Sequence, residues 1–596
     1  MHSAPFWFAV FRRTRVLSCT LLFVFLSVVF VDTLHAAPPF PQNLGNGLDK
    51  LVQTKVPAYF NSGVEAQGTA MAALAITDDQ GRVLVRVNPS AGSAKKPAIK
   101  ISSLRNSLAA SIPSFRVTAV DLKYHGLGVM DAFVALEDVT TVATFPGVRS
   151  VILELKPYHH RARGTSNHAA ESSALHAVSG DTFTKIGTAF DQGVTQHRVD
   201  QINQYYNPSA AVDYEGQGMS IGFLSDSYAN ITTSSRSAAR DVTNFDLPGD
   251  AGNPVNTQPV VVLQDYTSGG TDEGRAMVQI GYKMAPKARL AFASADFGEV
   301  GFADNIRALA GIPGYTYDDA IQQGFAADTI CDDVGYYDEP YFQDGIIGMG
   351  INDAADYGVA YFSSAGNDIG INGYESDLRW VPNGSGLTAA DNTALAGTNI
   401  DLTGVPPELY AGGFHNFNPV PWQLDVAQTV NASNSVLTVL QWNDPYDQNT
   451  TPIYVQPPIF TGNGTITNST PVDFTVPAVL AQGTLYELDA NADPGSGVDV
   501  TVTIKDPDGN TIVSQDNTVD EVVRFFAPVT GANYTISIGR YASTIGPFHI
   551  TLYETTGFPA GTGISTDVNL LVFRADTGAF LPNSSLDSNN FATNEP

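Results

Sequence analysis

The sequence predicts a multidomain chain in which an α/β parallel-sheet domain follows an α+β domain and is interrupted by β-sandwich insertions. Three observations support this fold class. The 596 residues exceed the roughly 250 to 300 residues at which single hydrophobic cores stop growing. Strand and helix signals alternate from 187 to 413, which favours a parallel sheet with helices on both faces. Short period-two runs without helix signals follow, as expected for β-sandwiches.

The first 37 residues have the three parts of a secretory signal. Arginines precede an apolar stretch, Val16–Val31, and small residues around Ala36 provide a cleavage site. The apolar stretch is short for a membrane span, which needs roughly 20 residues. We therefore expect a secreted or cell-surface protein without membrane contact after signal cleavage.

The composition is strongly acidic, with 31 Lys and Arg against 60 Asp and Glu and a net charge of -29. Such a balance argues against nucleic acid or anionic membranes as partners. Asp-rich turns such as Asp506–Gly509 are candidates for bound Ca²⁺, although no cofactor is required. Cys331 is the one cysteine that would remain after signal removal, so no intramolecular disulfide is expected. We expect a monomer.

The region before the parallel sheet, 38–158, has an α+β pattern. It alternates strands such as Arg82–Val87 with amphipathic pieces such as Ile101–Ile112. The polar stretch 159–186 follows and is predicted to be a flexible linker. The same pattern over 38–158 would also fit a small α+β binding domain that is unrelated to the rest of the chain.

In the α/β region, 187–413, polar residues follow predicted strands, and the carboxyl ends of parallel strands are where active residues gather. Asp226 and Asn367 both lie at such ends. Farther along, 450–562 is predicted to be one β-sandwich. The segments 414–449 and 563–596 are predicted to be two halves of a second sandwich, which the first one splits.

Three motifs in order carry a resemblance to a known family. They are Ile221–Ser227, a strand ending in a carboxylate; Gly269–Gln279, a helix start; and Val359–Asn367, a strand ending in an amide. Together they resemble the subtilisin and sedolisin superfamily of serine peptidases. The resemblance implies that Val139–Val151 is the end of a propeptide and that 450–562 is a pre-peptidase C-terminal type of domain.

The resemblance also implies roles at the helix start. Serine proteolysis needs a nucleophile, a base and donors for the oxyanion. Subtilisins use a histidine as base, but no histidine lies between His197 and His415. Sedolisins use a glutamate, which Glu273 matches, whereas Met277 replaces their aspartate. Asp226 is the candidate to fill that gap, and a proton shared by the two carboxylates would favour activity at acid pH.

Further assignments follow from the same resemblance. Asn367 matches the oxyanion donor of subtilisins, and Gly335 and Tyr336 would line the substrate cleft and pair with a peptide backbone. Asp272, next to Glu273, is the alternative candidate for the base. A Gly-Thr-Ser-x-x-x-Pro motif for the nucleophile does not occur; the similar Gly164–Ala170 lacks the proline and precedes the aspartate strand.

The sequence thus predicts the N-terminal portion of a secreted serine endopeptidase that hydrolyses protein or peptide substrates and lacks the nucleophilic serine. A non-catalytic pseudoprotease or surface adhesion protein that binds through its sandwiches is the first alternative. In that case Asp226 is a helix cap, Glu273 a first-turn glutamate and Asn367 a turn residue. A metal-dependent hydrolase is the second alternative, and no cluster of His or Cys ligands supports it.

Overall fold

A computed structural model describes most of the chain. The described residues are 5–9, 41, 43–90, 99–159, 186–189, 191–202, 214–267, 269–314, 325–366, 373–381, 395, 397–410, 413–420, 422–431, 438–444, 453–481, 484–507, 509, 511–515, 520–527, 530–541, 543–555 and 568–582. They form two compact units. One comprises 1–117, 122–153 and 375–596, and the other comprises 118–121 and 154–374. Both α/β and all-β regions are present.

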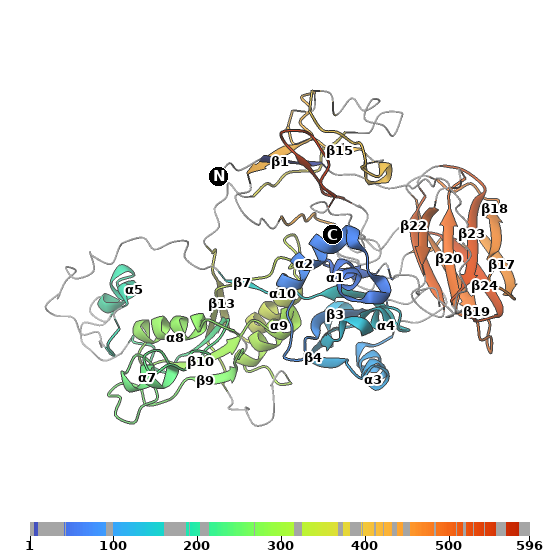
Figure 1. The fold of residues 1–596 in the computed structure, drawn as a ribbon. Coiled ribbons are helices and arrows are strands. Elements are labelled where there is room, and N and C mark those ends of the chain that lie inside the picture. The colour runs from blue at the N-terminus through green and yellow to red at the C-terminus, as the bar shows by residue number, and fades with distance from the viewer. Residues whose placement is uncertain are drawn as a thin grey trace, which may run out of the picture. The chain divides into compact units, whose positions relative to one another are not determined.

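The second unit is built on a five-stranded parallel sheet (Figure 1). The order of its strands is β13-β11-β8-β10-β9. Its strands are β8 (Ser220–Ser225), β9 (Val261–Gln264), β10 (Arg289–Ser294), β11 (Thr329–Asp332) and β13 (Ala360–Ser363). The earliest strand, β8, is central, and later strands lie on both sides of it. In such doubly wound sheets, functional residues gather beyond the carboxyl ends of the strands next to the point of reversal.

Helices cover both faces of this sheet because its strands present apolar residues in both directions. On one face Leu224 and Ala291 share a core with α9 (Gly298–Leu309) and α10 (Ile346–Asp356). On the other face Phe223 packs with α8 (Glu273–Met284). The short helices α5 and α7 span Gln192–Gln196 and Ala238–Thr243. The predicted parallel sheet with helices on both faces is therefore confirmed.

The other unit begins with a sheet in which β2, β6, β3 and β5 are neighbours in this order. These strands span Leu44–Gly45, Val148–Leu153, Val83–Pro89 and Val129–Val134. The helices are α1 (Leu48–Lys55), α2 (Glu65–Leu74), α3 (Ile101–Ser111) and α4 (Val139–Ala143). The predicted strand at 82–87 and the predicted helix at 101–112 correspond to β3 and α3. A further strand, β4, spans Arg116–Asp121.

Two antiparallel four-stranded sheets form the region 460–554, with the orders β17-β24-β19-β22 and β18-β23-β20-β21. Their side chains meet in one core. The strands are β17 (Phe460–Ile466), β18 (Val472–Val476), β19 (Leu485–Ala492), β20 (Val500–Lys505), β21 (Thr511–Gln515), β22 (Glu521–Phe526), β23 (Tyr534–Arg540) and β24 (Gly546–Glu554). This arrangement is a β-sandwich.

Chain segments on either side of this sandwich share a separate core. Phe414 and Val426 pack in one cluster with Leu571 and Phe573. The backbone N–H of Asp401 donates to the carbonyl of Gly578 at 2.9 Å. Residues before and after the sandwich thus contribute to one smaller β region, and its identity as a second, split sandwich stays a prediction. The strands of that region are β14 (Trp380–Val381), β15 (Phe414–His415), β16 (Gln428–Asn431) and β25 (Leu571–Arg574).

The stretch predicted to be a secretory signal includes one described strand, β1 (Pro5–Ala9). β1 lies between β16 and β25 and pairs antiparallel with both. Short 3-10 turns complete the structure at Pro57–Tyr59, Ser62–Val64, Tyr124–Gly126, Leu136–Asp138, Val199–Gln201 and Pro407–Tyr410. Among the described residues, no helix is both long enough and apolar enough to cross a membrane.

Candidate active site

Asp226 follows β8 directly and holds the N-terminus of α8. Its carboxylate accepts hydrogen bonds from the backbone N–H groups of Thr271 and Glu273, at 2.5 and 3.0 Å, and from the Thr271 hydroxyl at 2.5 Å. Burial opposes ionisation of Asp226, but the hydrogen bonds from Thr271 and Ser227 outweigh it and lower the pKa of Asp226. This side chain is therefore an ionised anchor for the helix start.

Close packing fixes the first turn of α8 against the sheet. A Cβ atom on Gly274 would lie only 2.2 Å from the ring of Phe292, so a larger residue would push the helix away. The position of Glu273, one residue earlier, depends on this contact. A glycine at 274 thus places the Glu273 side chain at the carboxyl edge of the sheet.

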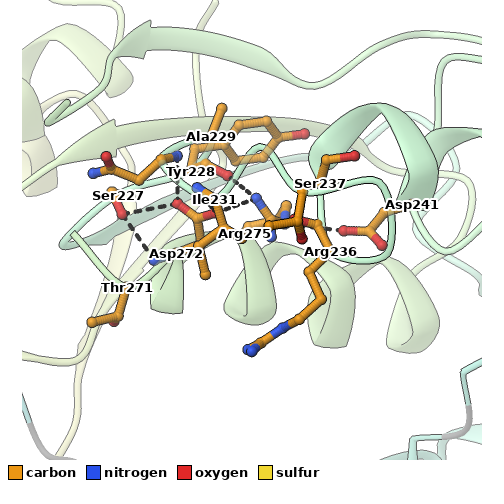
Figure 2. Close-up of polar contacts among 12 residues, drawn as sticks. Ser227, Tyr228, Ala229, Ile231, Arg236, Ser237, Asp241, Thr271, Asp272 and Arg275 are labelled. Carbon is orange, nitrogen blue, oxygen red and sulfur yellow. Dashed lines mark hydrogen bonds and ion pairs between the residues drawn. The ribbon is translucent and has the colours of Figure 1, made fainter. Parts of the chain in front are cut away.

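The carboxylate of Asp272, the alternative candidate for the base, is engaged in contacts that hold the surrounding structure together. Its carboxylate accepts the backbone N–H groups of Asn230 and Ile231, at 2.7 and 2.8 Å. It also pairs with Arg275, which in turn pairs with Asp241 at 3.0 Å (Figure 2). Asp272 is 5% exposed. Its oxygens are thus engaged in holding the loop after β8, in contrast to those of Glu273.

The Glu273 carboxylate points to a different set of partners. The hydroxyl of Ser225 donates to Glu273 Oε2 at 3.3 Å. Ser225 is fully buried, so it orients Glu273 and is not placed to attack a substrate. The same Oε2 atom lies 3.3 Å from Nδ1 of His159. Glu273 and Asp226 meet through the backbone N–H of Glu273, and the described contacts include no hydrogen bond between their carboxyl groups.

A third carboxylate, Asp296, joins the site, and sequence reasoning did not identify it. It follows β10, the strand next to β8. Its carboxylate lies 3.1 Å from Nε2 of His159. Burial raises the pKa of Asp296, and the like charges of Asp226 and Glu273 add to this, so that His159 lowers it only in part. Its place just beyond the carboxyl end of a parallel strand is the sequence signal that could have identified it.

His159 comes from the stretch predicted to be a flexible linker. It ends the two-residue strand β7 (Tyr158–His159), which pairs antiparallel with β12 (Val334–Gly335). Its side chain is 8% exposed. The position of β7 therefore brings an imidazole to the carboxylates, although α8 itself has no histidine.

The remaining predicted site residues have separate outcomes. Gly335 pairs with Tyr158 in the β7–β12 ladder, and its role in a substrate cleft stays a prediction. Tyr336 is only 3% exposed, and its hydroxyl donates to the carbonyl of Ala295 at 2.6 Å. The Tyr336 side chain thus belongs to the core and does not line a cleft. Asn367, the predicted oxyanion donor, lies outside the described residues.

Cation sites are not evident in the part of the chain that the structure describes. No group of three or more His, Cys, Asp or Glu side chains there is arranged to hold a metal ion. Asp506, in the turn considered for Ca²⁺, is buried, and Asp508 lies outside the described residues.

The imidazole of His159 is predicted to stay protonated well above neutral pH. Burial alone would lower its pKa, but Asp296 and Glu273 outweigh burial and raise the pKa of His159 to about 10 from its ordinary value of 6.5. Because the folded-state pKa is raised, the stabilisation is complete below pH 6.5 and is lost as the pH rises through about 10.

This titration is measurable by NMR of ¹⁵N-labelled histidines, with the His159 signal assigned from a His159→Gln variant. His415 serves as the internal control, because burial and the nearby Arg379 lower its pKa. We expect the His159 signal to remain that of imidazolium at pH 8, where the His415 signal is already that of neutral imidazole. A His159 signal that titrates near its ordinary value would show that the imidazole is not held between the carboxylates.

Comparison with known proteins adds no assignment. No protein-family model matches the chain, and a search of curated proteins gives no match either. The fold and the site alone define the class of protein: an α/β parallel-sheet unit with three carboxylates at the carboxyl edge of its sheet, accompanied by β-sandwich regions.

Proposed function

We propose that the chain belongs to a secreted serine-type endopeptidase, with the parallel-sheet unit binding the substrate and supplying the base. One observation supports this above all others. An extended segment, β7, lies antiparallel to β12 and ends among Glu273, Asp296 and Asp226. Strand addition to an exposed sheet edge is a common way for proteins to bind extended peptides. A peptide bound in this way would pass directly beside the acid groups.

In this proposal Glu273 is the general base that takes the proton of the nucleophile. Its carboxylate is oriented by Ser225, and its backbone is held by Asp226, so its position is defined by two neighbouring contacts. His159 pairs with the same oxygen and must leave before Glu273 can accept a proton. The chain in this conformation is thus occupied at its own site.

The sequence suggested that Glu273 and Asp226 share a proton, and Asp296 is a further candidate for the partner of Glu273. Two close carboxylates favour one proton between them, and the carboxyl group with the raised pKa is the one that keeps it. Burial chiefly raises the pKa of Asp296, whereas hydrogen bonds from Thr271 and Ser227 lower that of Asp226. Asp296 is therefore the better candidate for the protonated partner of Glu273.

The decisive experiment uses the protein made from the full reading frame, including any codons that follow Pro596. We expect it to cleave casein faster at pH 4 than at pH 7 and to react with a fluorophosphonate probe for activated serine. Replacing Glu273 by glutamine should reduce cleavage by about 10²- to 10⁴-fold, the usual contribution of a general base. An Asp356→Asn variant is the control, because Asp356 is exposed at the end of α10.

A protein without cleavage and without labelling at either pH would refute the endopeptidase proposal. It would favour the second candidate, a non-catalytic module that binds peptide segments. The full burial of Ser225 favours this second candidate, because the serine that contacts Glu273 is not accessible to a substrate.

A further inference from the structure

β7 occupies the site, and its two side chains indicate which residues the site would accept in an extended segment. The backbone of β7 pairs with β12 in the register Tyr158 to Gly335 and His159 to Val334. Backbone pairing alone is independent of side chains, so it gives affinity without selectivity. Selectivity must come from the places where the two side chains of β7 lie.

The first side chain, that of Tyr158, lies over a position without a side chain. A Cβ atom on Gly335 would be 2.2 Å from the ring of Tyr158, so only glycine leaves room for an aromatic ring there. The ring also stacks on Tyr337, with 4.4 Å between the centroids and 26° between the planes. Stacked aromatic pairs add stabilisation beyond the area that they bury. This place therefore suits an aromatic residue.

The second side chain, that of His159, lies among negative charges. Glu273 on α8 is 3.3 Å from Nδ1, Asp296 after β10 is 3.1 Å from Nε2, and Asp226 after β8 adds a further negative charge nearby. The Asp226 oxygens are already bound by backbone and hydroxyl donors. Two partly buried carboxylates thus face the residue at this place, and a neutral or acidic residue would leave them without a counter-charge.

From these contacts we infer that the β12 edge, with Tyr337, Glu273 and Asp296, is a binding site for extended peptides in which an aromatic residue is followed by a cationic one. β7 is the internal occupant of this site. The inference rests on the proposed function for the role of the site: a peptide of this class would occupy Glu273 as His159 does, and so would inhibit the proposed peptidase rather than serve as its preferred substrate. It also makes β7 a competitor that must be displaced before another peptide binds.

The test measures binding and not cleavage. In the full chain, a Tyr158→Ala, His159→Ala double variant weakens the internal occupant. Labelled peptides with the sequences Lys-Pro-Tyr-His, Lys-Pro-Tyr-Lys, Lys-Pro-Tyr-Glu and Lys-Pro-Ala-Lys are then titrated and followed by fluorescence anisotropy. We expect the first two to bind at least about ten-fold more tightly than the last two, because a charge-assisted pair and an aromatic contact are each lost.

Controls separate charge recognition from general effects. A Glu273→Gln change in the same background should remove most of the preference for lysine over glutamate, and Asp356→Asn should preserve it. Equal affinity for the four peptides, absence of binding, or a preference that survives Glu273→Gln would each overturn the inference. Mass spectrometry of the recovered peptides keeps the two proposals apart: selective binding supports the inference whether or not the peptides are cleaved, whereas cleavage without selective binding contradicts the inferred specificity and leaves the endopeptidase proposal standing.

A second pair of variants covers the case in which the double variant does not fold. In the otherwise unchanged chain, His159→Lys should retain the hydrogen-exchange protection of the β12 backbone. His159→Glu should reduce that protection by about ten-fold or more, because a third carboxylate replaces the cation. Equal protection in both variants would show that the charge at 159 does not hold β7 in the site.

Discussion

Replacing Arg307 by alanine is expected to destabilise the parallel-sheet unit by about 3–5 kcal/mol, the usual cost of breaking a buried ion pair from one side. Arg307, on α9, is fully buried. It pairs with Asp121 at 2.8 Å and with Asp353 on α10 at 2.8 Å. Asp121 is itself fully buried, so alanine at 307 would remove the cation paired with a carboxylate that water does not reach.

Hydrogen–deuterium exchange of peptides from α9 and β10 measures this effect for the unit alone, which matters because multidomain chains rarely unfold in one step. Arg574→Ala is the matched control. Arg574 also forms an arginine–aspartate pair, with Asp576 at 2.7 Å, but both side chains are more than 40% exposed. We expect this control to leave protection unchanged. An Arg307→Ala variant as protected as the original protein would mean that the buried pairs contribute little.

The parallel sheet could be predicted from the sequence because its signals are local. Buried strands such as β8 and β10 are continuous apolar runs, and helices between them have the period of an amphipathic helix. Proline after Ala285 marks the end of α8. The strands of the sandwich between 460 and 554 also have a local signal, since the character of the sequence changes to short period-two runs there.

The composition of the site was less predictable. Asp226 and Glu273 are close in the fold, and each has a motif around it. His159 has none, because two-residue strands such as β7 and β12 have no periodicity to read. Its place depends on pairing between distant parts of the chain. Polar residues around 159 favoured a linker, and the carboxylates that make this histidine a buried residue are not visible locally.

The assignment of Tyr336 to the substrate cleft failed for a reason in strand geometry. Successive side chains of an extended segment point to opposite sides. Gly335 faces Tyr158, so the next residue turns inward, and Tyr336 packs near Phe302 with ring centroids 6.2 Å apart. The neighbouring Tyr337 is the aromatic residue that contacts β7. Because of this alternation, Gly335 and Tyr336 face opposite sides of the segment.

Asp272 and Glu273 are adjacent in sequence, yet substitutions at the two positions are expected to have opposite consequences. Asp272 accepts two backbone N–H groups and the hydroxyl of Ser227 and pairs with Arg275. Asp272→Ala should therefore cost about 3–5 kcal/mol, because partly buried backbone donors lose their acceptor and the buried Arg275 loses one of its two carboxylate partners. Alanine is also disfavoured at the left-handed φ of 59° that Asp272 adopts.

Glu273→Gln should change stability by less than about 1 kcal/mol, since glutamine has nearly the same shape and can still accept from Ser225. Its effect should appear in the site, as weaker attachment of His159 and as loss of any cleavage. Hydrogen exchange of the loop after β8 and of β7, measured on both variants, separates these outcomes. Asp272→Asn refines the comparison, because asparagine tolerates the backbone conformation and keeps an acceptor while removing the charge that faces Arg275. If Glu273→Gln unfolded the loop while Asp272→Ala left it protected, the roles of the two acids would have to be exchanged.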